Sequence, residues 1–359
     1  HGYTNKDIKP PVFTQGYKVG AKVNDELTVN INSTEIQEIS STYDIANNRV
    51  VIFSVPLAQY NGSAVVGTVN SGNNSISVGS SFIYKAGRSE MISATYDSAK
   101  EKVVLAYKNG GSPKGEAIVG TVDSSNNSIS YGSEVIFDYE NSWHIGSTYD
   151  SANERVVLAY SRVSSDGVAI VGEVVGTAIT FGSFAQYSNN SDNLNIPVYD
   201  STNNKVVISY TDYDNGYRGY LRVSTVDPSN NSIGLGNSFL FSGTSQVYWG
   251  SGAYDTNSDR VVIVTGLDST NTGDVSIFAT APLTTNLTAE NYIGIAGEDI
   301  ANAATGKVNV LGGVNSGQSG LTTAKKYYVA QTGILTTTAD TPSVVAGTSI
   351  SDTKILVRW

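Results

Sequence analysis

One acidic and one basic residue recur together along the chain and are the first candidates for chemistry. The aspartate usually follows a tyrosine, and a lysine or arginine stands five positions later, as in Asp150 and Arg155. Such a pair could serve acid–base catalysis. An active site is needed only once, however, whereas an aspartate before a tight turn accepts backbone N–H groups in every copy. We therefore interpret the aspartates as turn anchors that pair with the basic residues across the turn: Asp44, Asp97, Asp150, Asp200, Asp255 and Asp299.

Other catalytic arrangements are missing from the sequence. The two histidines are His1 and His144 and cysteine is absent, which excludes a histidine-rich or thiolate metal site. The G-x-S-x-G, H-E-x-x-H and P-loop motifs do not occur. The 32 acidic residues allow many carboxylate pairs, and no spacing favours one of them. The sequence therefore predicts a protein that is not an enzyme and needs no cofactor or metal.

The aspartates mark a unit that recurs every 44 to 55 residues. In the second copy, β-branched and aromatic residues predict strands over 92–96, 102–108, 116–122 and 128–137, separated by Gly, Asn, Asp and Ser. No helical period is visible. Repeated units of four antiparallel strands are typical of propeller blades, whereas a solenoid has shorter rungs. We predict an all-β fold, a β-propeller of about six four-stranded blades, or of seven if the termini share one.

The two ends of the chain depart from this unit. Residues 1–36 contain the strand-like segment KVNDELTVNIN, which we expect to close the ring. Residues 37–285 hold five blade repeats, and residues 286–359 hold a longer, degenerate closing blade. No stretch approaches the roughly 20 apolar residues of a membrane span. The formal charge of −10 disfavours nucleic acid as a partner.

The segments leading into the first strand of each unit vary between copies and carry large side chains. In a propeller, these segments share one face with the loops between the second and third strands. Aromatic rings beside amide and carboxylate groups bind sugars by stacking and hydrogen bonding. The alternative is that the tryptophans fill core between blades. We predict ligand-binding residues on this variable face: Trp143, His144, Tyr248, Trp249, Glu38, Glu90 and Tyr292.

Two parts of the sequence resemble virion surface proteins. The units YDSANERVVLAYSRVSSDGVAIVG and YDSTNNKVVISYTD resemble repeats of phage tail-fibre-like proteins, especially of marine and cyanobacterial phages, over about residues 37–280. The stretch 286–359, with QSGLTTAKKYYV and TPSVVAGTSIS, is similar to a terminal module of such proteins. The resemblance implies a virion or extracellular location, other virion proteins as partners, and binding to a host cell-surface glycan or receptor.

Two alternatives to a host-binding protein stay open. One is a purely structural subunit of a virion or an extracellular filament, and the other is a polysaccharide-degrading enzyme on a propeller scaffold. A homo-oligomer is compatible with each of the three.

Overall fold

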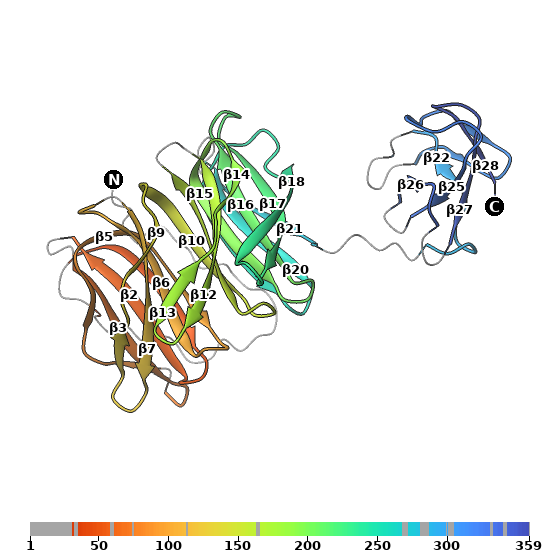
Figure 1. Ribbon diagram of the computed structural model, residues 1–359. Coiled ribbons are helices and arrows are strands. Elements are labelled where there is room, and N and C mark those ends of the chain that lie inside the picture. The colour runs from red at the N-terminus through yellow and green to blue at the C-terminus, as the bar shows by residue number, and fades with distance from the viewer. Residues whose placement is uncertain are drawn as a thin grey trace. The chain divides into compact units, whose positions relative to one another are not determined.

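The computed structural model describes residues 31, 35–57, 61–73, 75–112, 114–162, 166–267, 272–280, 287–298, 300, 305–330, 333–339 and 343–358. Within these residues the backbone forms strands and turns and no helix, so the chain is an all-β protein (Figure 1). It divides into two compact units, His1–Ile145 with Glu173–Thr180, and Gly146–Gly172 with Phe181–Trp359. Asp299 and nearly all of the predicted ring-closing segment in residues 1–36 lie outside the described residues.

The third to fifth repeats each form an antiparallel sheet whose main strands follow one another in chain order, and the first two repeats join in one nine-stranded sheet. The second repeat has β5 (Phe82–Asp97), β6 (Lys102–Asn109), β7 (Lys114–Asp123), β8 (Ser128–Tyr131) and β9 (Val135–Asp138). The four strands predicted for this repeat are all present. The outermost strand is broken into β8 and β9, and both pieces pair with β7.

The other repeats follow the same order and differ mainly in the outer strand. The first and third comprise β1 (Ile36–Asp44), β2 (Arg49–Pro56), β3 (Asn61–Asn70) and β4 (Ser75–Val78), and β10 (Ser142–Asp150), β11 (Arg155–Arg162), β12 (Gly167–Val175), β13 (Ala178–Phe181) and β14 (Ala185–Ser188). The fourth and fifth comprise β15 (Ser191–Asp200), β16 (Lys205–Asp212), β17 (Arg218–Asp227) and β18 (Ser232–Leu240), and β19 (Val247–Asp255), β20 (Arg260–Leu267) and β21 (Thr272–Phe278).

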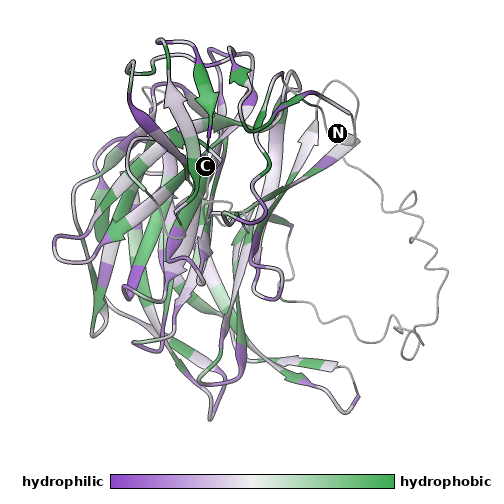
Figure 2. Cartoon of the chain, turned by 90° about the vertical axis from the view of Figure 1, so that its right-hand side faces the viewer, coloured by the Kyte–Doolittle hydropathy of each residue, from purple (hydrophilic) through white to green (hydrophobic). Residues whose placement is uncertain are grey.

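The middle strands of the second, third and fourth repeats are buried on both faces. β6 and β16 are each buried at six successive positions, although successive side chains of a strand point to opposite faces. In the second unit, Val206, Ile208 and Tyr210 pack with the third repeat, while Val207 packs with Val261 of the fifth. Hydrophobic residues accordingly follow the strands, and hydrophilic residues gather at the turns (Figure 2). The sheet of the fourth repeat therefore depends on a neighbour against either face.

The repeated aspartates cap the turn between the first and second strands. Buried Asp150 accepts hydrogen bonds from the backbone N–H groups of Ala152 and Asn153, both at 3.1 Å. Its second oxygen accepts from the Asn153 side chain at 2.8 Å. Equivalent backbone hydrogen bonds are made to Asp44, Asp97, Asp200 and Asp255. These five residues therefore occupy the turn-anchoring position that the sequence predicts.

At two of the five turns, the basic residue five positions later is an arginine that joins neighbouring repeats. Arg49 Nε donates to Asn127 Oδ1 at 2.7 Å, and its Nη2 donates to the Ser124 carbonyl at 2.7 Å. Arg155 Nε donates in the same way to Asn231 Oδ1 of the fourth repeat, at 2.6 Å. The predicted pairing of Arg49 with Asp44 is wrong, because the extended guanidinium fork reaches the turn of the next repeat.

A glycine in the outer strand receives that same turn. A Cβ at Gly182 would lie 2.1 Å from the Asn231 carbonyl oxygen, and one at Gly79 would lie 2.2 Å from that of Asn127. Both asparagines have φ of 54°, a left-handed conformation that asparagine tolerates. We call each set a sheet joint: Arg49, Asn127 and Gly79 in the first unit, and Arg155, Asn231 and Gly182 in the second.

The residues from 287 onward form a β-module of different topology. A two-stranded pair accompanies a five-stranded sheet with the order β24-β28-β27-β25-β26. The strands are β22 (Ile295–Ala296), β23 (Val308–Asn309), β24 (Val314–Asn315), β25 (Lys326–Val329), β26 (Leu335–Thr336), β27 (Val345–Ser349) and β28 (Ile355–Val357). Because this order is not sequential, these strands are not a sixth copy of the repeat sheet. The described strands of the expected closing blade in residues 286–359 thus have a strand order of their own.

Replacing Gly182 by alanine should lower the free energy of unfolding by about 1–3 kcal/mol, the usual cost of overpacking. The added Cβ would meet the Asn231 backbone, which cannot move without distorting the joint. Urea unfolding measures the change. Gly234→Ala is the matched control, since a Cβ there would have only an ordinary contact, 3.8 Å from the Thr225 carbonyl. Equal effects of the two substitutions would show that the joint is not tightly packed.

Acid should destabilise the fold through Asp200. Burial raises the pKa of Asp200, but hydrogen bonds from Thr280 and Asn203 outweigh it and hold that pKa below the usual 3.8. Such a carboxylate stabilises the fold above its unfolded pKa, and this contribution disappears as the pH falls through the folded pKa. We expect the melting temperature to fall below about pH 4, and Asp200→Asn to flatten that fall. Identical acid profiles for the two proteins would contradict this role.

Candidate functional site

The predicted ligand-binding residues lie in separate parts of the molecule. The first unit contains Glu38, Glu90, Trp143 and His144, and the second contains Tyr248, Trp249 and Tyr292. Tyr292 is buried in the core of the C-terminal module with Tyr327 and Val329, and burial raises its pKa to about 12. Tyr292 therefore packs in this core, and its place on a binding face with the other six residues stays a prediction.

Trp143 belongs to a packed polar cluster of the first unit. Lys108 Nζ stands 3.3 Å from the centre of the indole ring and 2.9 Å from the Glu90 carboxylate. Lys108 and Glu90 are buried, and Arg88 makes a second ion pair with Glu90. The ammonium group covers one face of the ring in a cation–π contact. Lys108 thus contacts both Trp143 and Glu90, and the ring face that it covers is not open to a ligand.

The two remaining residues of the first unit also have structural contacts. The Glu38 carboxylate accepts a hydrogen bond from the Ile92 backbone N–H at 3.0 Å, which links the first strands of two repeats. His144 follows Trp143 with a left-handed φ of 48°, and the two ring centres are 6.4 Å apart. A single aromatic face that unites Trp143 with Trp249 stays a prediction.

The structure brings Tyr248 and Trp249 together at the start of β19. Their ring centres are 5.9 Å apart, and the Trp249 side chain is exposed. Tyr248 in turn stacks on Tyr217 from the loop between β16 and β17, with ring centres 4.9 Å apart. Tyr248 and Trp249 belong to one of the variable segments from which the sequence predicts binding.

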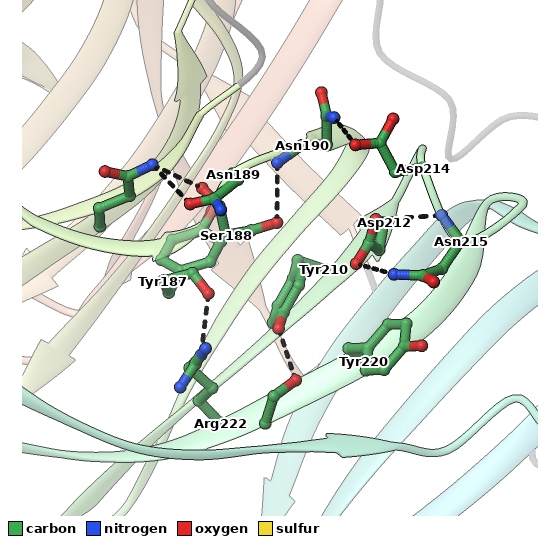
Figure 3. Close-up of a pocket in the computed structure, with 12 residues that line it drawn as sticks. Tyr187, Ser188, Asn189, Asn190, Tyr210, Asp212, Asp214, Asn215, Tyr220 and Arg222 are labelled. Atoms are coloured by element: carbon green, nitrogen blue, oxygen red, sulfur yellow. Dashed lines mark hydrogen bonds between the residues drawn. The ribbon is translucent and has the colours of Figure 1, made fainter.

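A cavity of about 510 Å³ lies beside this region, between β14 of the third repeat and β16–β18 of the fourth (Figure 3). Its volume is typical of small-ligand sites. Tyr187 and Tyr210 are buried at its base, and Tyr220 stacks on Tyr210 with ring centres 5.9 Å apart. Four exposed polar side chains also line the cavity: Gln186, Asn189, Asp214 and Asn215.

Hydrogen bonds fix the polar groups of the cavity. Arg222 Nε donates to the Tyr187 carbonyl at 2.8 Å, and its Nη1 donates to the Gly236 carbonyl at 2.6 Å. Among the described residues, none accepts a hydrogen bond from its Nη2. Asp212 accepts from the Asn215 side chain at 2.7 Å, which leaves further lone pairs on the carboxylate. The guanidinium and the carboxylate are therefore preorganised, with hydrogen-bonding capacity left for a ligand.

The equivalent space between the first two repeats is filled by an ion-paired triad. Lys85 Nζ lies 2.8 Å from carboxylate oxygens of both Glu116 and Glu134, and 5.7 Å from the centre of the Tyr107 ring. Tyr107 is the counterpart of Tyr210 in the repeat alignment. The counterparts of Lys85, Glu116 and Glu134 are Ser188, Tyr220 and Ser238. The cavity therefore opens where shorter or uncharged side chains replace a triad that fills the same place elsewhere.

Arg222 is a second departure from the repeat. The second and third repeats have Ile118 and Ile170 at this position, and both isoleucines are buried. An arginine among packed strands requires hydrogen-bond partners that an isoleucine does not need. Packing alone gives no reason for this exchange, whereas a donor at a binding site does.

The lining suits an uncharged ligand that carries many hydroxyl groups. Asp212 and Asp214 accept hydrogen bonds, Arg222 donates them, and the amides and hydroxyls do both. Two carboxylates beside one guanidinium disfavour an anion. No group of three or more His, Cys, Asp or Glu side chains suited to a metal occurs among the residues described by the structure. Within those residues there is also no helix of the length and apolarity that a membrane span requires.

Arg222 and the cavity residues Ser188, Tyr220 and Ser238 were not among the binding residues predicted from the sequence. A signal for them was present in the repeat alignment, where an arginine replaces isoleucine and two serines stand opposite charged residues. Binding residues were expected in the variable loops, whereas these four positions lie in the strands β14, β17 and β18. These residues form a site only because β14, β16, β17 and β18 lie around one cavity, which a linear alignment does not show.

Comparisons with known proteins give distant structural similarity and no family. No protein-family model matches the chain, and no curated protein matches it. The crystal structure of AofleA from Arthrobotrys oligospora is similar with a TM-score of 0.45 and 11% sequence identity, over 67% of this chain and 68% of that chain. A similarity of this size carries no argument about fold or function. The resemblance to phage tail-fibre-like proteins stays a prediction.

Lys108→Met should lower the free energy of unfolding by about 3 kcal/mol, because Glu90 stays buried without its principal partner. The double variant Lys108→Met/Glu90→Gln should recover part of this loss, since no buried charge is left unpaired. Chemical denaturation of the three proteins measures both changes. A single variant as stable as the parent protein would show that the cluster around Trp143 is not structural.

Proposed function

We propose that the protein is a non-enzymatic carbohydrate-binding protein and that the cavity between β14 and β16–β18 holds an uncharged saccharide. The observation that carries the proposal is the exchange of the Lys85, Glu116 and Glu134 triad for an open, polar cavity at the equivalent place in the fourth repeat. Protein interiors are normally filled, so an open space that is lined with donors and acceptors, at a place that the triad fills between the first two repeats, favours a ligand.

The chemistry of the lining supports a sugar over other small ligands. A pyranose ring has hydroxyl groups that both donate and accept, and it has faces of C–H groups that pack on aromatic rings. Asp212 and Arg222 supply a charged acceptor and a charged donor, whose hydrogen bonds are stronger than neutral ones. Tyr220 supplies an aromatic ring at the wall of the cavity.

The wider setting of the proposal comes from the sequence. The resemblance to tail-fibre-like proteins favours a virion surface location and a host cell-surface glycan as the ligand, with other virion proteins and further copies of the chain as partners. The doubly buried middle strands favour a β-propeller, in which every sheet is covered on both faces. A toroidal particle in electron micrographs is expected for the propeller, and an extended rod would contradict it.

Transplanting the triad tests the binding site. The variant Ser188→Lys/Tyr220→Glu/Ser238→Glu places the residues of the Lys85, Glu116 and Glu134 triad at the equivalent positions of the cavity. We expect the parent protein to bind neutral saccharides on a glycan array, and the transplanted variant to lose that binding while keeping its melting temperature. Arg222→Ile, which restores the residue of the other repeats, should weaken binding by about 10- to 100-fold, the cost of a charged hydrogen bond.

Two outcomes would contradict the proposal. If the folded triad variant binds the same saccharides as the parent protein, the cavity is not the site. If the parent protein releases reducing ends from the saccharides that it binds, the protein is an enzyme and the non-enzymatic assignment is wrong. Gly234→Ala serves as a control for nonspecific effects, because Gly234 does not line the cavity.

A further inference from the structure

Four aromatic rings form a continuous row in the second unit. Tyr213 meets Tyr217 edge to face with ring centres 5.0 Å apart, Tyr217 stacks on Tyr248 at 4.9 Å, and Tyr248 meets Trp249 at 5.9 Å. Tyr213 is 50% exposed and Trp249 is 65% exposed, so both ends of the row face solvent. We call this set the aromatic row. Large exposed aromatic groups in a cluster mark an interaction surface more often than isolated ones do.

Trp249 is braced in the manner of a stacking platform. It pairs across the sheet with Gly266, and a Cβ at Gly266 would lie 3.1 Å from Trp249 Cε3. The indole therefore rests on a strand that has no side chain at that point. The rest of its surface stays exposed, which is unfavourable for a residue that serves packing alone.

The loop between β16 and β17 connects the aromatic row to the cavity. Tyr213 N donates to the Asn190 carbonyl at 2.9 Å on the cavity side, and Val247 N donates to the Tyr217 carbonyl at 2.8 Å on the β19 side. The same loop gives Asp214 to the cavity edge, where Asn190 donates a hydrogen bond to its carboxylate. Hydrogen bonds at both ends thus hold the loop in place, so that rim and row form one continuous surface.

We propose that the aromatic row binds further sugar rings of the chain whose first residues occupy the cavity, so that the ligand is a linear oligosaccharide of uncharged hexopyranoses. This inference rests on the proposed function of the cavity. The rings offer faces for C–H stacking, and the carboxylates and amides of the loop offer hydrogen bonds at the edges of those rings. The exposed acidic group of Asp214 beside the row disfavours an anionic chain.

Chain-length dependence of affinity tests the inference. Isothermal titration with glucose and with malto- and cello-oligosaccharides of two to six residues, together with the neutral saccharides that the array identifies, provides the ligand series. We expect affinity to rise with chain length in the parent protein. Trp249→Ala and Tyr213→Ala should each weaken binding of the longest chains by about tenfold, the scale of one aromatic contact, and leave the shortest bound ligand unaffected. Tyr139→Ala is the control, because Tyr139 is 76% exposed and lies in the first unit.

The outcomes separate this inference from the proposed function. If length dependence is absent, or survives in both row variants, the row does not bind the chain, although short saccharides in the cavity still support the proposed function. If the row variants lose short and long ligands equally, the row belongs to the cavity site and the inference is wrong. If no saccharide binds the parent protein, both the inference and the proposed function are contradicted. Unchanged melting temperatures of the variants exclude unfolding as the cause.

Discussion

The burial of the middle strands of the second to fourth repeats on both faces is the constraint on which the rest of the structure depends. Strands such as β6 and β16 have six successive buried positions, so a single repeat would expose an apolar face to water. Neighbouring repeats must therefore meet, and the sheet joint is the device by which they do. In each joint an arginine donates through its guanidinium fork to an asparagine in a left-handed conformation. A glycine, which has no Cβ, lets the two backbones come close together. The uniform turns of the repeat are thus explained by packing between sheets.

The repeats also allow equivalent positions to be compared, so that a departure in one repeat can be recognised. Where the first two repeats meet, Lys85 fills the space with two ion pairs. At the corresponding place in the fourth repeat, the backbone course is conserved while the filling side chains are replaced by serines and a tyrosine. Because the sheet joint of the second unit is intact, the fold can tolerate an open space where the first two repeats have the triad. The variable loop after β16 then adds polar and aromatic groups at the rim of the open space.

The sequence predicted the strands and the turn aspartates well, because both depend on local patterns of alternating burial and turn residues. It failed where the outcome depends on distant segments. Arg49 was expected to pair with the nearby Asp44 but donates to Asn127, which lies 78 residues away. Trp143 looked like a binding residue but is covered by Lys108, whose position relative to the indole follows only from the strand register. Tyr248 and Trp249 were recognised as candidates, whereas their stacking partner Tyr217 was not, because a different loop supplies it.

The most direct test of the central claim is a crystal structure of the protein with a neutral oligosaccharide bound at saturation. The account predicts density for a sugar ring in the cavity, with hydroxyl groups in hydrogen-bonding distance of Arg222 Nη2 and the Asp212 carboxylate. It would be contradicted by a saccharide bound elsewhere, for example at Trp143, while the cavity between β14 and β16–β18 holds only water.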